Sequence, residues 1–136
     1  MSNVTSFPDL GSELTGKIIE AGLSVHKHFG PGLLENIYEE CLFVELVEMG
    51  FLVKKQQIMP ITYKGKNLEN AYRLDLWVEN KIVIEIKAVD KLLPIHEAQI
   101  LTYMRLSKSP LGLLINFNER LLKDGIKRFA LSHLAQ

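Results

Sequence analysis

The sequence predicts an α/β protein in which a mixed central β-sheet is flanked by α-helices. Three patterns indicate this fold class. Two helical patterns cover most of the first 49 residues, and alternating apolar residues over 74–86 are typical of a β-hairpin. The continuous apolar run at 113–115 is typical of a strand that is covered on both faces.

The first helix is expected to begin near Asp9 or Ser12 and to end at Phe29, after a flexible N-terminus over residues 1–10. Its apolar residues recur every three or four positions, as a helix with one buried stripe requires. This predicted stripe contains Leu14, Ile18, Ala21 and Val25. Residues 30–32, Gly-Pro-Gly, then break the helix.

The second helix is expected from about Leu33 to Met49, with Gly50 as the residue that ends it. Its predicted buried stripe contains Ile37, Cys41 and Val44.

The remaining elements alternate between strands and one helix. Residues 51–63 predict one or two strands, and 64–67 predict a turn into the long strand of the hairpin. A helix is expected over about 95–107, a buried strand over 111–117, and a last strand or short helix over 125–131.

The register of the hairpin brings two carboxylates together. Its apolar residues share one side of the sheet only if the pairs are Val78 with Ile82, Leu76 with Ile84 and Leu74 with Ile86. Asp75 then lies opposite Glu85, with Lys87 next along the same face. Two like charges at directly opposed positions repel each other.

A divalent cation between these carboxylates would remove the repulsion, and Lys87 or Arg73 could also neutralise them without a metal. Mg²⁺ prefers oxygen ligands, keeps several waters and usually takes only one or two protein carboxylates. Asp75 and Glu85 fit that requirement, so the sequence predicts a metal site on the hairpin.

Several motifs resemble those of one family. Asp75 followed by Glu85-Ile86-Lys87 resembles the D…(D/E)xK signature of the PD-(D/E)xK nuclease superfamily. Residues 32–38, Gly-Leu-Leu-Glu-Asn-Ile-Tyr, look like the motif of its GxxExxY family, and residues 99–103 match its QxxxY helix motif. Residues 72–75 and 85–89 are also similar. The resemblance runs from about Gly11 to Phe129, with no departure at a motif position.

The resemblance implies a restriction-endonuclease-like core over a single domain, residues 1–136. It implies Mg²⁺- or Mn²⁺-dependent hydrolysis of nucleic acid phosphodiester bonds, with DNA as the expected substrate. The implied metal ligands are Asp75, Glu85, the backbone carbonyl of Ile86, and Glu35. The implied catalytic residues are Asp75, Glu85, Lys87, Glu35, Gln99 and Tyr103. Lys87 would orient or deprotonate the attacking water, or hold the scissile phosphate.

Each helical residue of this set also has a structural interpretation. A carboxylate in the first turn of a helix, such as Glu35, is stabilised by the helix dipole alone. Tyr38 is equally consistent with core packing and with a hydrogen bond near the site. Gln99 and Tyr103 share a helix face, where the resemblance implies that Gln99 positions Lys87 or a water and that Tyr103 contacts a phosphate.

The amino-acid composition limits which binding partners and which cellular compartment are expected. The 136 residues include sixteen basic and sixteen acidic side chains, so bulk charge does not provide affinity for nucleic acid, and a local patch or an oligomeric groove must do so. The single Cys41 excludes an internal disulfide and suits a reducing cytoplasm. No apolar run approaches the length of a membrane span, and no signal peptide is expected.

The sequence therefore predicts a cytoplasmic nuclease with no membrane partner. The alternative is a binding or regulatory module that keeps the fold but acts only with a protein partner. A homodimer is also consistent with the resemblance, although no residue of this chain specifies one.

Overall fold

The computed structural model describes residues 12–131; Asp9 and the expected flexible segment 1–10 lie outside this range. In chain order its elements are α1 (Ser12–Phe29), α2 (Glu35–Glu48), β1 (Val53–Tyr63), β2 (Lys66–Val78), β3 (Ile82–Lys87), α3 (Pro94–Ser107), β4 (Leu111–Asn116), the 3-10 helix η1 (Leu122–Gly125) and β5 (Ile126–Ala130). The expected order of helices and strands is confirmed, with a strand as the last element.

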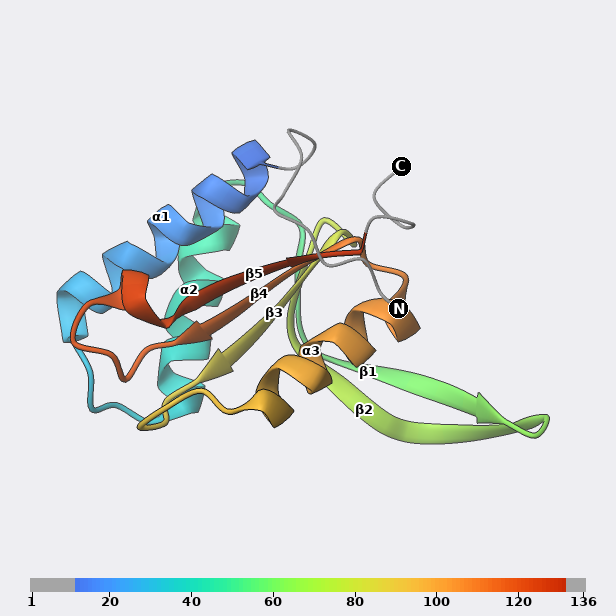
Figure 1. Cartoon of the computed structure of the whole chain (residues 1–136). Coiled ribbons are helices and arrows are strands. Elements are labelled where there is room, and N and C mark those ends of the chain that lie inside the picture. The colour runs from blue at the N-terminus through green and yellow to red at the C-terminus, as the bar shows by residue number, and fades with distance from the viewer. Residues whose placement is uncertain (1–11, 132–136) are drawn as a thin grey trace.

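The described strands form one mixed sheet in the order β1-β2-β3-β4-β5. Neighbouring strands are antiparallel except β3 and β4, which run parallel. A parallel pair needs a crossover connection, and α3 provides it. Helices α1 and α2 cover one face of the sheet, and α3 lies on the other (Figure 1). The α/β fold class with helices on both sides of a central sheet is therefore confirmed.

The sheet separates two hydrophobic clusters. The first lies under α1 and α2 and contains Leu76, Ile84 and Ile86 from the strands. The second lies under α3 and contains Val83 and Leu114. Every residue of β4 is buried, as its continuous apolar sequence predicted. The buried stripe of α1 is also confirmed, because Ile18, Ala21 and Val25 lie in the first cluster and Leu14 packs against it.

The predicted buried stripe of α2 is wrong. Ile37 and Val44 are 39% and 49% exposed, and Cys41 is only half-buried. The residues that face the sheet are one or two positions further along, namely Tyr38, Leu42 and Leu46, together with Glu39. Both sets have helical spacing, so periodicity could not choose between them.

The position of Tyr38 explains which set is buried. Its ring stacks on Phe117 with 4.6 Å between ring centroids. Its hydroxyl donates to the carbonyl oxygen of Gly30 at 2.5 Å and accepts from the amide of Leu33 at 3.0 Å. These contacts fix the rotation of α2. The alternative left open for Tyr38 is therefore decided in favour of core packing.

The register of the hairpin is confirmed only in part. Val78 pairs with Ile82 and Leu76 with Ile84, and the ladder between β2 and β3 ends there. The expected pairing of Leu74 with Ile86 is absent, and Leu74 packs in the second cluster, on the opposite side from Leu76.

This change of face coincides with an irregularity in the neighbouring strand. Gln56 of β1 has a φ of 51°, which interrupts the extended backbone. The β1–β2 ladder runs from Lys55–Leu76 to Gln57–Leu74 and omits the pair between them, Gln56 with Asp75. Strand irregularities of this kind re-aim side chains and are frequent near functional sites.

Beyond this point β1 and β2 continue as a two-stranded ribbon that projects from the rest of the sheet (Figure 1). We call residues 57–74 the arm. Its inner part packs through Met59, Ile61 and Tyr72 against the second cluster. Its outer part, residues 66–71, is exposed throughout.

Among the described helices, none is long and apolar enough to cross a membrane.

Candidate active site

Two carboxylates lie where the ladder between β2 and β3 stops, Asp75 within β2 and Glu85 near the end of β3. The amide of Asp75 donates to Oε2 of Glu85 at 3.1 Å, and the amide of Ile86 donates to Oδ2 of Asp75 at 2.9 Å. Each carboxylate therefore takes a backbone amide of the opposite strand. These side chain bonds bridge the two strands at the position where ladder bonds between Asp75 and Glu85 were expected.

Glu85 is the most perturbed acid of this pair. It is 5% exposed, and burial together with the neighbouring charge of Asp75 raises its pKa to about 8. Burial also raises the pKa of Asp75, against the opposing effect of the Ile86 amide and of Lys87. A half-buried carboxylate beside a buried one favours either a shared proton or a bound cation.

Two further residues of this region were not predicted. Gln56 donates from Nε2 to Oε1 of Glu39 at 2.7 Å and to Oδ1 of Asp75 at 3.3 Å. Glu39 is buried, and burial raises its pKa. Its spacing of four residues from Glu35 places both on one face of α2, which is a signal that sequence reasoning could have used. The left-handed conformation that aims Gln56 has no such signal.

Lys87 is the lysine whose charge acts on three acids of this region. Its positive charge acts on Glu85, Asp75 and Glu35, and it lowers the pKa of each. Glu35 opens α2 and reaches the end of β3, where the amide of Ala88 also lowers its pKa. Desolvation nevertheless dominates and raises the pKa of Glu35. The structure thus brings Glu35, Asp75, Glu85 and Lys87 together, with acids in excess.

Helix α3 contributes one residue to this group. Tyr103 is half-buried, and the pKa of its hydroxyl is raised by burial and by the charges of Glu85 and Asp75. Its ring stacks on Tyr72 at 5.0 Å between centroids. Gln99, four residues earlier, is exposed, and its side chain makes no hydrogen bond with the residues that the structure describes. The expected contact between Gln99 and Lys87 is therefore absent from this structure.

The residues fit a cation that needs few protein ligands. Within residues 12–131, no group of three or more His, Cys, Asp or Glu side chains is arranged to hold a metal ion. Mg²⁺ does not need such a group, since it keeps most of its waters and takes one or two carboxylates. Asp75 and Glu85 provide that pair. The side chain of Ile86 is fully buried in the first cluster, so only its backbone could serve as a ligand.

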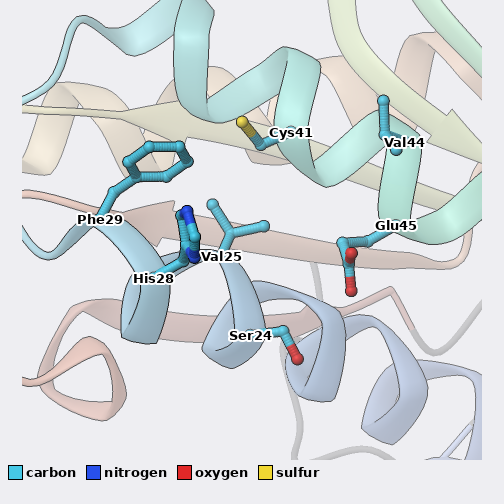
Figure 2. A pocket seen from close by; sticks show the side chains of 7 residues that line it. All are labelled: Ser24, Val25, His28, Phe29, Cys41, Val44 and Glu45. Atoms are coloured by element: carbon cyan, nitrogen blue, oxygen red, sulfur yellow. The ribbon is translucent and has the colours of Figure 1, made fainter.

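A hollow between α1 and α2 has none of these carboxylates in its lining. Figure 2 shows Phe29, Cys41 and Val44 around it, together with the polar side chains of His28 and Glu45. Its lining is mainly apolar, and none of the acidic residues of the strand ends contributes to it. It is therefore not a continuation of the carboxylate site.

A mixed sheet with helices on both faces, and two acids with a lysine where its strands diverge, define the class of metal-dependent nuclease folds. A profile of the PD-(D/E)XK nuclease superfamily matches residues 12–129, and the chain belongs to this superfamily. The narrower GxxExxY family remains a prediction from the motif.

A solved structure described as "Crystal structure of SSO0001" is similar, with a TM-score of 0.49 and 22% sequence identity over 93% of this chain and 67% of that one. We draw no argument from this distant likeness. No curated protein matches the chain.

Membership of the superfamily supports a nuclease-like function, the use of divalent metal and the binding of nucleic acid.

Proposed function

We propose that this protein is a Mg²⁺- or Mn²⁺-dependent nuclease of the GxxExxY type that hydrolyses phosphodiester bonds, with DNA as its substrate. The observation that carries the proposal is the pair of Asp75, which is half-buried, and Glu85, which is buried. Two acids at the end of a sheet, one with a pKa near 8, are costly unless a cation compensates them.

The proposed roles follow from the contacts. Asp75 and Glu85 would hold the metal together with the backbone carbonyl of Ile86, and Glu35, whose pKa responds to the charge of Asp75, would bind one of its waters. Gln56, through its bonds to Asp75 and Glu39, fixes the rotamer of Asp75. When bound, the metal would stabilise the charge that develops on the phosphate and lower the pKa of a water.

Lys87 and Tyr103 act on the reacting groups in this proposal. The positive charge of Lys87 acts on Asp75 and Glu85, and its ammonium is proposed to orient the attacking water or hold the scissile phosphate. The hydroxyl of Tyr103 faces the same charges and is available to contact a phosphate oxygen. Gln99 is proposed to bind a water or substrate, because it has no partner among the described residues.

Cleavage of plasmid and of single-stranded DNA in Mg²⁺ and Mn²⁺ tests this function. Asp75→Asn, Glu85→Gln and Lys87→Met are each expected to lower the rate at least about 100-fold, because each removes an electrostatic contribution to the transition state. Glu45→Gln, which removes a carboxylate beside the hollow between α1 and α2, should cleave as the wild type does. Equal rates for Glu85→Gln and Glu45→Gln would contradict the proposed site.

A second candidate function has its own observation. Leu34, Ile37 and Val44 leave an apolar surface exposed on α2, which is typical of a surface that contacts another protein. The protein would then keep the fold and act only with that partner. Metal binding without cleavage of any nucleic acid by the isolated chain would favour this function.

A further inference from the structure

Only the inner part of the arm packs against the hydrophobic core, and its outer part is exposed. The β3 strand pairs with β2 only from Leu76 to Val78, so residues 57–74 form a ribbon of two strands that β3 does not extend. Isolated two-stranded ribbons are at best marginally stable in water. The inner half is supported by Met59 and Ile61, whereas the outer half packs on nothing comparable among the described residues.

Charge is distributed unevenly along the chain. The whole protein has a formal net charge of zero, but the arm carries Lys64, Lys66 and Arg73 against the single acid Glu69. The catalytic region has the opposite balance, with Glu35, Glu39, Asp75 and Glu85 around Lys87. A neutral nuclease needs a local cationic surface for phosphates, and the arm provides one.

The tip of the arm combines these cations with an exposed aromatic ring. Tyr63 is 63% exposed and pairs across the ribbon with Lys66. The ammonium of Lys64 lies 5.6 Å from the centre of the Tyr63 ring. Rings beside lysines are typical platforms for single-stranded nucleic acid, since an unpaired base can stack on the ring while the cations contact phosphates. In a duplex the base faces are occupied by their neighbours.

The arm also begins at the site. Its root is the pair of Gln56 and Asp75, which share a hydrogen bond, and Arg73 follows two residues from Asp75. Lys66 is nine residues from Asp75 along β2, a span of at most about 30 Å at roughly 3.3 Å per residue. A strand of about nine stacked nucleotides covers that distance at ~3.4 Å each.

We propose that the arm is a binding site for single-stranded nucleic acid, in which Tyr63 stacks on a base and Lys64 and Lys66 contact phosphates. The strand that leads away from the carboxylates would lie along the arm, with Arg73 as an intermediate contact. This inference rests on the proposed nuclease function. It adds that the part of the substrate next to the cleavage site is single-stranded.

Fluorescence anisotropy with a single-stranded 20-mer and a 20-base-pair duplex tests the proposal, with EDTA present so that cleavage cannot interfere. Lys64→Ala/Lys66→Ala should weaken single-strand binding about tenfold or more at low salt. It should also reduce the slope of log affinity against log salt by about 1.4, since each phosphate contact contributes roughly 0.7. Lys27→Ala/Lys123→Ala removes the same charge from exposed positions elsewhere and should have little effect on either quantity.

Variants at Tyr63 separate stacking from charge. Tyr63→Ala should weaken single-strand binding about fivefold or more and leave duplex binding unchanged, while Tyr63→Phe should bind as the wild type does. An equal loss for single strand and duplex would overturn the stacking contact. Unchanged circular dichroism and Tm would show that each variant keeps its fold.

The outcomes for the arm and for catalysis are distinct. If Lys64→Ala/Lys66→Ala binds single-stranded DNA as well as Lys27→Ala/Lys123→Ala does, the arm is not a nucleic-acid site. The same follows if the wild type binds neither probe, whatever the cleavage assay shows. If binding depends on the arm but no DNA is cleaved, the binding site stands and the proposed nuclease activity is refuted.

Discussion

At the scale of single residues, the acids and the lysine of the hairpin could be predicted, whereas the groups that orient them could not. Alternation alone placed Asp75 beside Glu85, and both carboxylates do meet across the strands. Gln56 escaped prediction because its left-handed backbone depends on the tertiary structure around it. Glu39 follows Tyr38, whose packing on Phe117 directs that part of α2 inward.

The raised pKa of Glu85 predicts how stability depends on pH without metal. The folded protein holds this proton up to about pH 8, while the unfolded chain releases it near its ordinary pKa of about 4.3. Between these values the folded state binds more protons, so the free energy of unfolding falls as pH rises. Glu85→Gln cannot lose a proton and should remove this contribution.

Thermal unfolding in EDTA measures the effect. We expect Glu85→Gln to raise the Tm at pH 8 by about 5 °C or more, and to leave it unchanged at pH 4, where both proteins carry a neutral side chain. A variant that is less stable than the wild type at pH 8 would show that the buried carboxylate is already compensated by the protein itself.

At the scale of elements, the type and length of each helix and strand could be predicted from the sequence. The rotation of a helix about its own axis could not. Helix α3 was expected over 95–107 and spans Pro94–Ser107. Helix α2 was expected in the right place, but with the wrong face buried, because apolar residues occur on both sides of it. The β2–β3 ladder was extended too far, since the sequence does not reveal where a strand irregularity turns Leu74 to the other face.

The contact between α3 and β4 gives a test at this scale. A Cβ added to Gly112 of β4 would lie 2.5 Å from Sδ of Met104 and 3.2 Å from Cδ1 of Ile100. Gly112→Ala should therefore push α3 outward, destabilise the protein by about 1–3 kcal/mol and lower cleavage, because α3 carries Tyr103.

Gly16 provides the matched control for this substitution. It lies on the exposed side of α1, where an added Cβ meets nothing within 4 Å. Gly16→Ala should stabilise the protein by about 0.5–1 kcal/mol through its higher helix propensity. Chemical denaturation compares the two variants. Equal effects of the same sign would contradict the tight packing of α3 on β4.

At the scale of the whole molecule, the sheet brings opposite charges to one end. Asp75 and Glu85 lie where the β2–β3 ladder stops, and the arm, which carries Lys64, Lys66 and Arg73, projects from the rest of the sheet beyond this point (Figure 1). The zero net charge of the sequence concealed this separation, since both signs occur in equal number. The fold class followed from periodicity, but the arm became evident only from how far β3 pairs with β2.

The central claim is that Asp75 and Glu85 hold a divalent cation, and titration calorimetry with Mg²⁺ and Mn²⁺ at pH 8 tests it most directly. The account predicts one binding event for the wild type and for Glu45→Gln, with release of about half a proton, because Glu85 is half protonated at pH 8 and the metal displaces that proton. Asp75→Asn and Glu85→Gln should each abolish the signal. A wild type that binds neither metal, or variants that bind as well as the wild type, would contradict the claim.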